Sequence, residues 1–295
     1  MIDVLRRTTK RLPGVSGILE TKLYKRLRHR ISLRRDRRVN STFTGFYRLP
    51  TQFEALTGPV MRFLLRDRAD AALKIVVVGA SNGAEPYTIS SLLRTSHPDL
   101  AFDVSAFDID PEIIEKARTA RYAVQEDVYN NQRIPQAFID RTFDLVEGSL
   151  AVKEEVAARV RFEIADALDP ALADKVGRAD LLVAQNFLFH LEPKPARAAL
   201  RNLCGLLEDR SALFVDGVDL NIRLKVTREF GLEPLDYRIG EIHDEARWAR
   251  AVGWPYAYWG LEPFMTTSRS WRRRYATIFL KGSRAGEARP AVSTS

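Results

Sequence analysis

A glycine-containing turn at residues 79–83 has the composition of a site that binds a ligand through the protein backbone. The short β-branched run Lys74-Ile75-Val76-Val77-Val78 precedes it, and its lack of alternation is typical of a strand buried on both faces of a parallel sheet. Asp108 ends the next predicted strand, 102–107. Because a carboxylate there can accept two hydrogen bonds from a ribose diol, these segments predict a nucleoside or nucleotide site. A tight turn without a ligand is the alternative.

The turn does not match the phosphate-binding motifs. It lacks the complete G-x-G-x-x-G pattern, and no Gly-Lys-Ser/Thr of a P-loop follows it. A nucleoside without a diphosphate fits better, so S-adenosylmethionine (SAM) is the predicted cofactor. No metal is expected, because the four histidines are scattered and Cys204 is the single cysteine.

Strands and helices alternate from residue 73 onward, which predicts a doubly wound α/β sheet. Three more strands are expected at 161–164, 179–184 and 212–216, and a late strand at 274–280 is expected to close the sheet edge. Helices are expected at 50–67, 84–93, 111–118, 132–143 and 195–207, with Asp110 as the N-cap of the third. A small hairpin is expected at 145–152 around Gly148.

The segments around this sheet differ in composition. We predict a basic helical arm at 1–40, a helical segment closing over the site at 41–72, an α/β domain at 73–281 and a disordered tail at 282–295. Within the α/β domain, we predict a small subdomain at 120–160 and an aromatic insertion at 217–272.

The positive charge is concentrated at one end of the chain. Residues 1–40 hold thirteen of the 46 Lys and Arg residues but three of the 38 Asp and Glu residues. Leu19, Leu23, Leu27 and Ile31 recur there every four residues, which predicts a helix with a basic opposite face. Such an arm docks on an acidic partner or membrane surface, or else packs its leucines on the body. The remaining chain is nearly neutral, so no nucleic-acid partner is expected.

The composition is that of a globular protein, with 45% hydrophobic and 28% charged residues, and excludes a wholly disordered chain. No apolar run reaches the roughly 18 residues of a membrane span. No apolar segment of a secretory signal lies near Met1. We therefore expect a cytoplasmic protein, with the arm as the part that would make it membrane-peripheral.

Five segments, in order, resemble motifs of the CheR family of chemotaxis-receptor methyltransferases. The glycine turn continues as Ala84-Glu85-Pro86-Tyr87-Thr88-Ile89, similar to that family's Ser-Thr-Gly-Glu-Glu-Pro-Tyr-Ser-Ile signature. The other four are Thr44-Gly45-Phe46-Tyr47-Arg48, Ala106-Phe107-Asp108-Ile109-Asp110, the strand at 162–168, and Gln185-Asn186-Phe187-Leu188-Phe189-His190. The resemblance covers about residues 40–216 and implies a Rossmann-like SAM-dependent methyltransferase sheet.

The resemblance also implies roles for individual residues. The methionine and ribose side of SAM would be lined by Gly79, Ser81, Gly83 and Glu85, and Asp108 would hold the ribose. Asp166 would contact the adenine amino group, and Asn186 would lie beside the sulfonium. Thr44 and Arg48 would close over the methyl group. Arg48, Asn186 and His190 are the implied catalytic residues. Simpler alternatives remain: Glu85 as a helix cap or surface pair, Arg48 as a solvated arginine and Asn186 as a turn residue.

Three residues depart from the family pattern. His190 replaces a tyrosine, Gln185 an arginine and Asp166 an asparagine. His190 is either a base for a hydroxyl or amine acceptor, or a hydrogen-bond donor in place of the tyrosine hydroxyl. These departures leave the predicted cofactor unchanged and leave the methyl acceptor open.

Three hypotheses for the function follow. In the first, the chain methylates glutamate carboxylates of an acceptor protein. In the second, it methylates a small-molecule or lipid carboxylate. In the third, it is a SAM-binding sensor or scaffold without catalysis. The first two need no general base, because a carboxylate with a pKa of about 4.3 is already ionised at pH 7.

The predicted insertion at 217–272 contains all four tryptophans. One hypothesis is that residues 254–264 roof the acceptor pocket, with Glu262 and His243 facing it. The alternative is that Trp254, Trp259 and Phe264 form a satellite core of the insertion.

Overall fold

The computed structural model describes residues 44–66, 68, 72–124, 134–248 and 264–282. The predicted basic arm and the predicted tail beyond Gly282 lie outside these residues, as do Trp254, Trp259 and Glu262. Among the described helices, none combines the length and the hydropathy that a membrane span requires.

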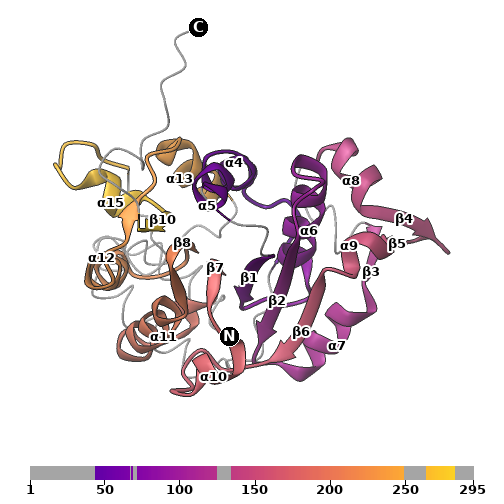
Figure 1. Cartoon of the computed structure of the whole chain (residues 1–295), viewed down its shortest axis with the longest axis horizontal. Coiled ribbons are helices and arrows are strands. Elements are labelled where there is room, and N and C mark those ends of the chain that lie inside the picture. The colour runs from indigo at the N-terminus through magenta and orange to yellow at the C-terminus, as the bar shows by residue number, and fades with distance from the viewer. Residues whose placement is uncertain (1–43, 67, 69–71, 125–133, 249–263, 283–295) are drawn as a thin grey trace, which may run out of the picture.

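Seven strands form one sheet in the order β6-β2-β1-β7-β8-β10-β9 (Figure 1). The strands are β1 (Leu73–Val78), β2 (Phe102–Asp108), β6 (Val160–Ile164), β7 (Ala179–Ala184), β8 (Leu207–Val215), β9 (Glu233–Pro234) and β10 (Ile278–Lys281). β6, β2, β1, β7 and β8 are parallel, and β10 is antiparallel to both of its neighbours. The predicted doubly wound α/β architecture is confirmed.

The environment of β1 explains why apolar and polar residues do not alternate along it. Leu73, Ile75 and Val77 belong to one core cluster, and Val76 and Val78 belong to a second cluster on the opposite face. All five are buried, so each face of the strand needs apolar side chains.

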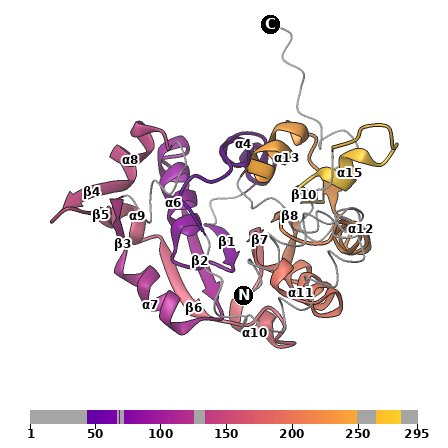
Figure 2. The same ribbon diagram turned by 180° about the vertical axis from the view of Figure 1, so that it is seen from behind.

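Helices cover both faces of the sheet. The first core cluster contains residues of α6 (Ala84–Ser96) and α7 (Pro111–Thr119), and the second contains residues of α10 (Leu172–Val176), α11 (Pro193–Gly205) and α12 (Leu220–Glu229). In Figure 1, α11 and α12 lie to the left of the strands and α6 and α7 to the right; Figure 2 shows the arrangement from behind. The predicted N-cap is confirmed, because the Asp110 side chain accepts hydrogen bonds from the Glu112 and Ile113 amides.

The predicted late strand is wrong in its start and its position. Residues 274 and 275 belong to helix α15 (Trp271–Tyr275), and β10 begins at Ile278. β10 lies between β8 and β9, so the two-residue strand β9 forms the sheet edge. A strand this short, ending in Pro234, has no apolar period by which the sequence could reveal it.

A second sheet of three antiparallel strands has the order β3-β5-β4. It consists of β3 (Arg121–Ala123), β4 (Phe143–Val146) and β5 (Ser149–Val152), with helices α8 (Gln136–Thr142) and α9 (Glu154–Ala157) beside it. The predicted hairpin is confirmed, and its two-residue turn has positive φ at Glu147 and Gly148. The hydroxyls of Ser91 and Thr142 are 2.6 Å apart and tie this unit to α6.

The helix predicted at 50–67 is interrupted. α4 (Pro50–Ala55) passes into a π-helical turn at Leu56–Val60 and then into α5 (Met61–Leu65). Pro59 lies inside the π turn and has no amide hydrogen for the regular α-helical bond. The chain becomes extended at Arg66.

Candidate functional site

A cavity of about 830 Å³, including the part open to solvent, lies at the carboxyl ends of β1, β2 and β7. This is where an open α/β sheet binds its ligands. Its lining includes every predicted cofactor-binding or catalytic residue except Gly83: Thr44, Arg48, Gly79, Ser81, Glu85, Asp108, Asp166, Asn186 and His190.

The turn after β1 brings the backbone up to the cavity. The amides of Gly79 and Ala80 donate to the Phe107 carbonyl of β2, at 2.8 and 3.0 Å. Gly79 has a φ of 77°, and a Cβ atom added to it would lie 2.7 Å from the Phe187 ring. The turn therefore requires glycine here for both its conformation and its packing.

Asp108 is oriented by the same turn. Its carboxylate accepts hydrogen bonds from the Ser81 amide at 2.8 Å and the Asp110 amide at 3.1 Å, one on each oxygen. A carboxylate has about four acceptor positions, so capacity remains for hydroxyl groups of a ligand. The aspartate is thus held at the cavity wall by two backbone amides.

Gly83 has a packing role in the structure. It has a φ of 89° at the N-cap of α6 and is not among the cavity-lining residues. A Cβ atom on it would lie 2.9 to 3.1 Å from the side chains of Phe162, Tyr87 and Tyr122. Glycine is needed there because aromatic rings close on the start of α6.

Glu85 and Arg48 place opposite charges in the cavity. Glu85 lies half-buried in the first turn of α6, and burial raises its pKa to about 7. The Arg48 guanidinium opposes this rise, and the Asp216 carboxylate adds to it. Arg48 also donates to the Gln185 side-chain oxygen at 3.5 Å. Arg48 is therefore partly buried at the cavity wall.

Asn186 follows β7 with a left-handed backbone, at a φ of 58°. Its amide donates to the Asp216 carbonyl at 3.3 Å. A Cβ atom on Gly217 would lie 2.9 Å from the Asn186 Cα. Gly217 thus leaves room for the residue that faces the cavity. The sequence analysis missed this role, although a glycine directly after a buried strand was a usable signal.

Asp166 and His190 complete the polar wall. The Asp166 Oδ1 accepts from the Leu168 amide at 2.9 Å, just beyond β6. His190 ends the 3₁₀ turn Leu188–His190, and its ring centroid is 4.0 Å from that of Phe189. Ile109 and Phe187 add an apolar part to the lining, which the sequence analysis also missed.

Residues 42–236 match the family described as CheR methyltransferase, SAM binding domain. The chain belongs to this family. The predicted family is confirmed, and SAM is the cofactor of the matched domain. The match ends at Asp236, so α13 (Ile239–Trp248), α15 and β10 lie beyond it.

Several relatives carry the CheR-type region. A probable biofilm formation methyltransferase WspC of Pseudomonas putida is 26% identical over 193 residues, which are 65% of this chain and 44% of that protein. Chemotaxis protein methyltransferase 2 of Vibrio cholerae is 26% identical over 60% of this chain and 61% of its own length. A chemotaxis protein methyltransferase of Salmonella typhimurium is 27% identical over 66% and 65%. The chain thus spans less than half of WspC.

The cavity of this CheR-family domain fits SAM in its donor set. SAM carries a sulfonium, an ammonium and a carboxylate; Glu85, Asp108 and Asp166 supply negative charge, and Arg48 supplies positive charge. Within the described residues, no group of three or more metal-ligating side chains occurs.

His243 lies away from this cavity. It is buried on α13, with its ring centroid 5.6 Å from that of Phe264 and 5.3 Å from that of Tyr275. It is not among the described lining residues, so the prediction that it faces the site is wrong for this cavity. Phe264 also packs on Trp271, which agrees with the satellite-core alternative for these residues. The rest of the predicted roof, Trp254, Trp259 and Glu262, is outside the described residues.

Proposed function

We propose that this CheR-family chain transfers the methyl group of SAM to a carboxylate, and that the acceptor is a glutamate of a partner protein. The observation that supports this most is Arg48, which lines the cavity and is the one lysine or arginine in the described lining. A guanidinium can hold a carboxylate by paired hydrogen bonds. The relatives named chemotaxis protein methyltransferases support a protein acceptor.

The cofactor would lie along the carboxyl ends of the strands. Asp108 would accept from the ribose hydroxyls, Asp166 from the adenine amino group, and Glu85 from the methionine ammonium. Asn186 would lie beside the sulfonium, while Gly79 and Ser81 let the cofactor approach the backbone. Thr44 and Arg48, on the segment before α4, would close over the reacting methyl group.

The reaction is an in-line displacement at the methyl carbon. A carboxylate oxygen of the acceptor forms a bond to the methyl group as the carbon–sulfur bond breaks, and the sulfonium becomes a neutral thioether. No proton moves in this step, so the site needs alignment and charge complementarity and no general base. His190 would then donate a hydrogen bond near the acceptor, as a replacement for a tyrosine hydroxyl.

Labelled SAM tests the proposal directly. The purified chain is incubated with SAM carrying a tritiated methyl group and a bacterial lysate, which is then separated into protein and organic-soluble fractions. We expect label in protein, released as methanol by base, because carboxyl esters are base-labile. Base-labile label in the organic fraction would instead identify a small carboxylate or lipid acceptor. Base-stable label would indicate an amine or ether product, and no label would favour a sensor or scaffold.

Asp108→Ala tests the placement of the cofactor. Two charged hydrogen bonds to ribose would be lost, so SAM affinity should fall by about 100-fold in calorimetry. Asp144→Ala is the control, since it removes an exposed carboxylate from β4. An unchanged affinity in a folded Asp108→Ala protein would contradict the placement.

A further inference from the structure

A backbone amide at the start of α4 donates to a side chain from a distant part of the chain. α4 begins at Pro50, two residues after Arg48, and the N-cap residue Leu49 has no side chain that can cap it. The first amides of a helix lack intrahelical acceptors and need an oxygen from elsewhere. Whatever supplies that oxygen also sets where the adjacent Arg48 backbone lies.

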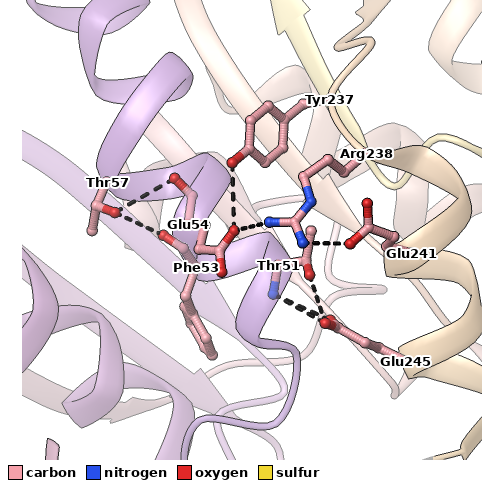
Figure 3. Close-up of polar contacts among 8 residues, drawn as sticks. All are labelled: Thr51, Phe53, Glu54, Thr57, Tyr237, Arg238, Glu241 and Glu245. Carbon is pink, nitrogen blue, oxygen red and sulfur yellow. Dashed lines mark hydrogen bonds and ion pairs between the residues drawn. The ribbon is translucent and has the colours of Figure 1, made fainter. Parts of the chain in front are cut away.

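Glu245 supplies this oxygen from α13. Its carboxylate accepts from the Thr51 hydroxyl at 2.6 Å and from the Thr51 amide at 3.2 Å (Figure 3). Thr51 is buried and Glu245 is half-buried, so the hydrogen bonds are partly shielded from water. The two residues are 194 positions apart in the chain.

A second contact docks the same two helices. Arg238, just before α13, pairs with Glu54 of α4 and with Glu241 of α13, and the Tyr237 hydroxyl donates to Glu54 at 3.5 Å. Figure 3 shows the side chains of both helices converging on this polar cluster. α13 therefore holds α4 at its first turn and again one turn later.

α4 is connected to the cavity by a chain of buried amides. Gln52 donates to the Thr277 hydroxyl at 2.7 Å and accepts from the Gln185 side chain at 2.6 Å. Gln185 lines the cavity, and its oxygen accepts from Arg48. A shift of the first turn of α4 would thus move Arg48 both through the backbone and through this chain of side chains.

We infer that Glu245 is a positioning residue: by capping α4 at Thr51 it holds Arg48 in the orientation in which it faces the cofactor and acceptor. Glu245 lies beyond the region that matches the CheR family, so this chain uses its carboxyl-terminal part to set the geometry of its site. The inference rests on the proposed role of Arg48 in the cavity.

A double-mutant cycle with SAM affinity as the readout tests the inference. Arg48→Ala should weaken SAM binding about tenfold, and Glu245→Ala about fivefold. In the Arg48→Ala protein, adding Glu245→Ala should change the affinity by less than about twofold, because the group through which Glu245 acts is then absent. Calorimetry on the full chain gives all four affinities, and circular dichroism shows that each variant is folded.

Matched variants separate positioning from stability. Asp144→Ala removes an exposed carboxylate on β4, away from both helices, and it should leave SAM affinity unchanged. Thr51→Val loses the hydroxyl bond and should weaken binding, whereas Thr51→Ser retains the hydroxyl and should restore it.

The possible outcomes are distinct. If Arg48→Ala weakens binding and Glu245→Ala does not, or if the two effects add fully, Glu245 does not act through Arg48. The inference then fails, and the proposed function is unaffected. If Arg48→Ala leaves SAM affinity unchanged, Arg48 does not contact the cofactor and the inference fails, whereas the proposed role of Arg48 toward the acceptor carboxylate is tested separately by methyl transfer.

Discussion

Ser81 and Asn186 hold left-handed backbone conformations at the cavity wall, with φ of 51° and 58°. Such backbone conformations are unfavourable for residues other than glycine. They persist where contacts with the surrounding structure hold the backbone in place. The Ser81 amide is held by Asp108, and the Asn186 amide by the carbonyl of Asp216. At the residue scale, backbone strain at the site is therefore balanced by hydrogen bonds that also orient the polar wall.

Gly217→Ala should damage the site through Asn186. The new Cβ atom would lie 2.9 Å from the Asn186 Cα, at a φ of 66°. We expect a loss of SAM affinity of about tenfold or more and a lower melting temperature. Gly231→Ala is the matched control, because it has a φ of 64° and no atom within 4 Å of the added Cβ. It should cost about 1 kcal/mol of stability and leave SAM affinity intact. Equal affinities in the two variants would contradict the role of Gly217.

SAM affinity should depend on the protonation of Glu85. Burial raises the pKa of Glu85 to about 7, so the carboxyl group is largely protonated at pH 6 and ionised at pH 8. The SAM ammonium favours the ionised form, so affinity should fall as pH drops below 7, and binding near pH 6.5 should release a proton. Calorimetry in two buffers of different ionisation enthalpy measures that proton. Glu85→Gln should abolish the release; a release that persists in this variant would assign it to another group.

At the scale of elements, an ion pair holds the entry to the sheet. Arg68 makes two hydrogen bonds to the Asp180 carboxylate, at 2.8 and 2.9 Å, and a third to the Ala72 carbonyl. Asp180 also accepts from the Lys74 amide at 2.8 Å. The pair thus joins the chain after α5 to the beginnings of β1 and β7, at the end of the sheet opposite the cavity.

Arg68→Ala should destabilise the fold without changing the chemistry of the site. Removing Arg68 leaves the largely buried Asp180 carboxylate with the Lys74 amide but without its charged partner, which we expect to cost about 2 kcal/mol in chemical denaturation. Arg201→Ala, which breaks the exposed pair with Glu229 at 2.7 Å, should cost less than about 0.5 kcal/mol. SAM affinity should be normal in both variants at low denaturant. Equal costs would show that the Arg68 pair contributes no more than a surface ion pair.

At the scale of the whole molecule, the charge is distributed unequally. The net charge of the chain is +8, and the basic residues of 1–40 exceed its acidic residues by more than that. These residues are outside the described structure, whereas the cavity is formed by residues 44–191. We propose that the arm docks the chain on an acidic partner or membrane surface.

Deletion of residues 1–35 should separate docking from cofactor binding. SAM affinity should be unchanged, because the described lining contains no residue of the arm. Association of the full chain with vesicles containing phosphatidylserine should fall steeply between low salt and about 0.5 M salt, and the deletion should abolish it. Salt-insensitive association, or none, would contradict docking on a membrane surface; acidic protein partners are then tested by the same salt series.

The central strands and the site residues at their ends were predictable because their signals are local. A strand buried on both faces must be mainly apolar, as β1 and β7 are apart from Lys74 and Asp180 near their starts. Asp108 is the last residue of β2 and Asn186 lies two residues after β7, and the carboxyl ends of parallel strands meet at one edge. The order of motifs along the chain was therefore enough to place these residues in one cavity and to indicate its cofactor.

The remaining features depend on contacts between distant parts of the chain. The edge strand β9, the packing role of Gly83 and the clearance between Gly217 and Asn186 have no signature in neighbouring residues, because the groups that require them come from other elements. The cap that Glu245 provides for α4 spans 194 positions. By itself, the sequence determined the sheet, the family and the cofactor. Tertiary packing decided which residues orient the site, since a side chain acquires its partner only when the elements that carry both are brought together.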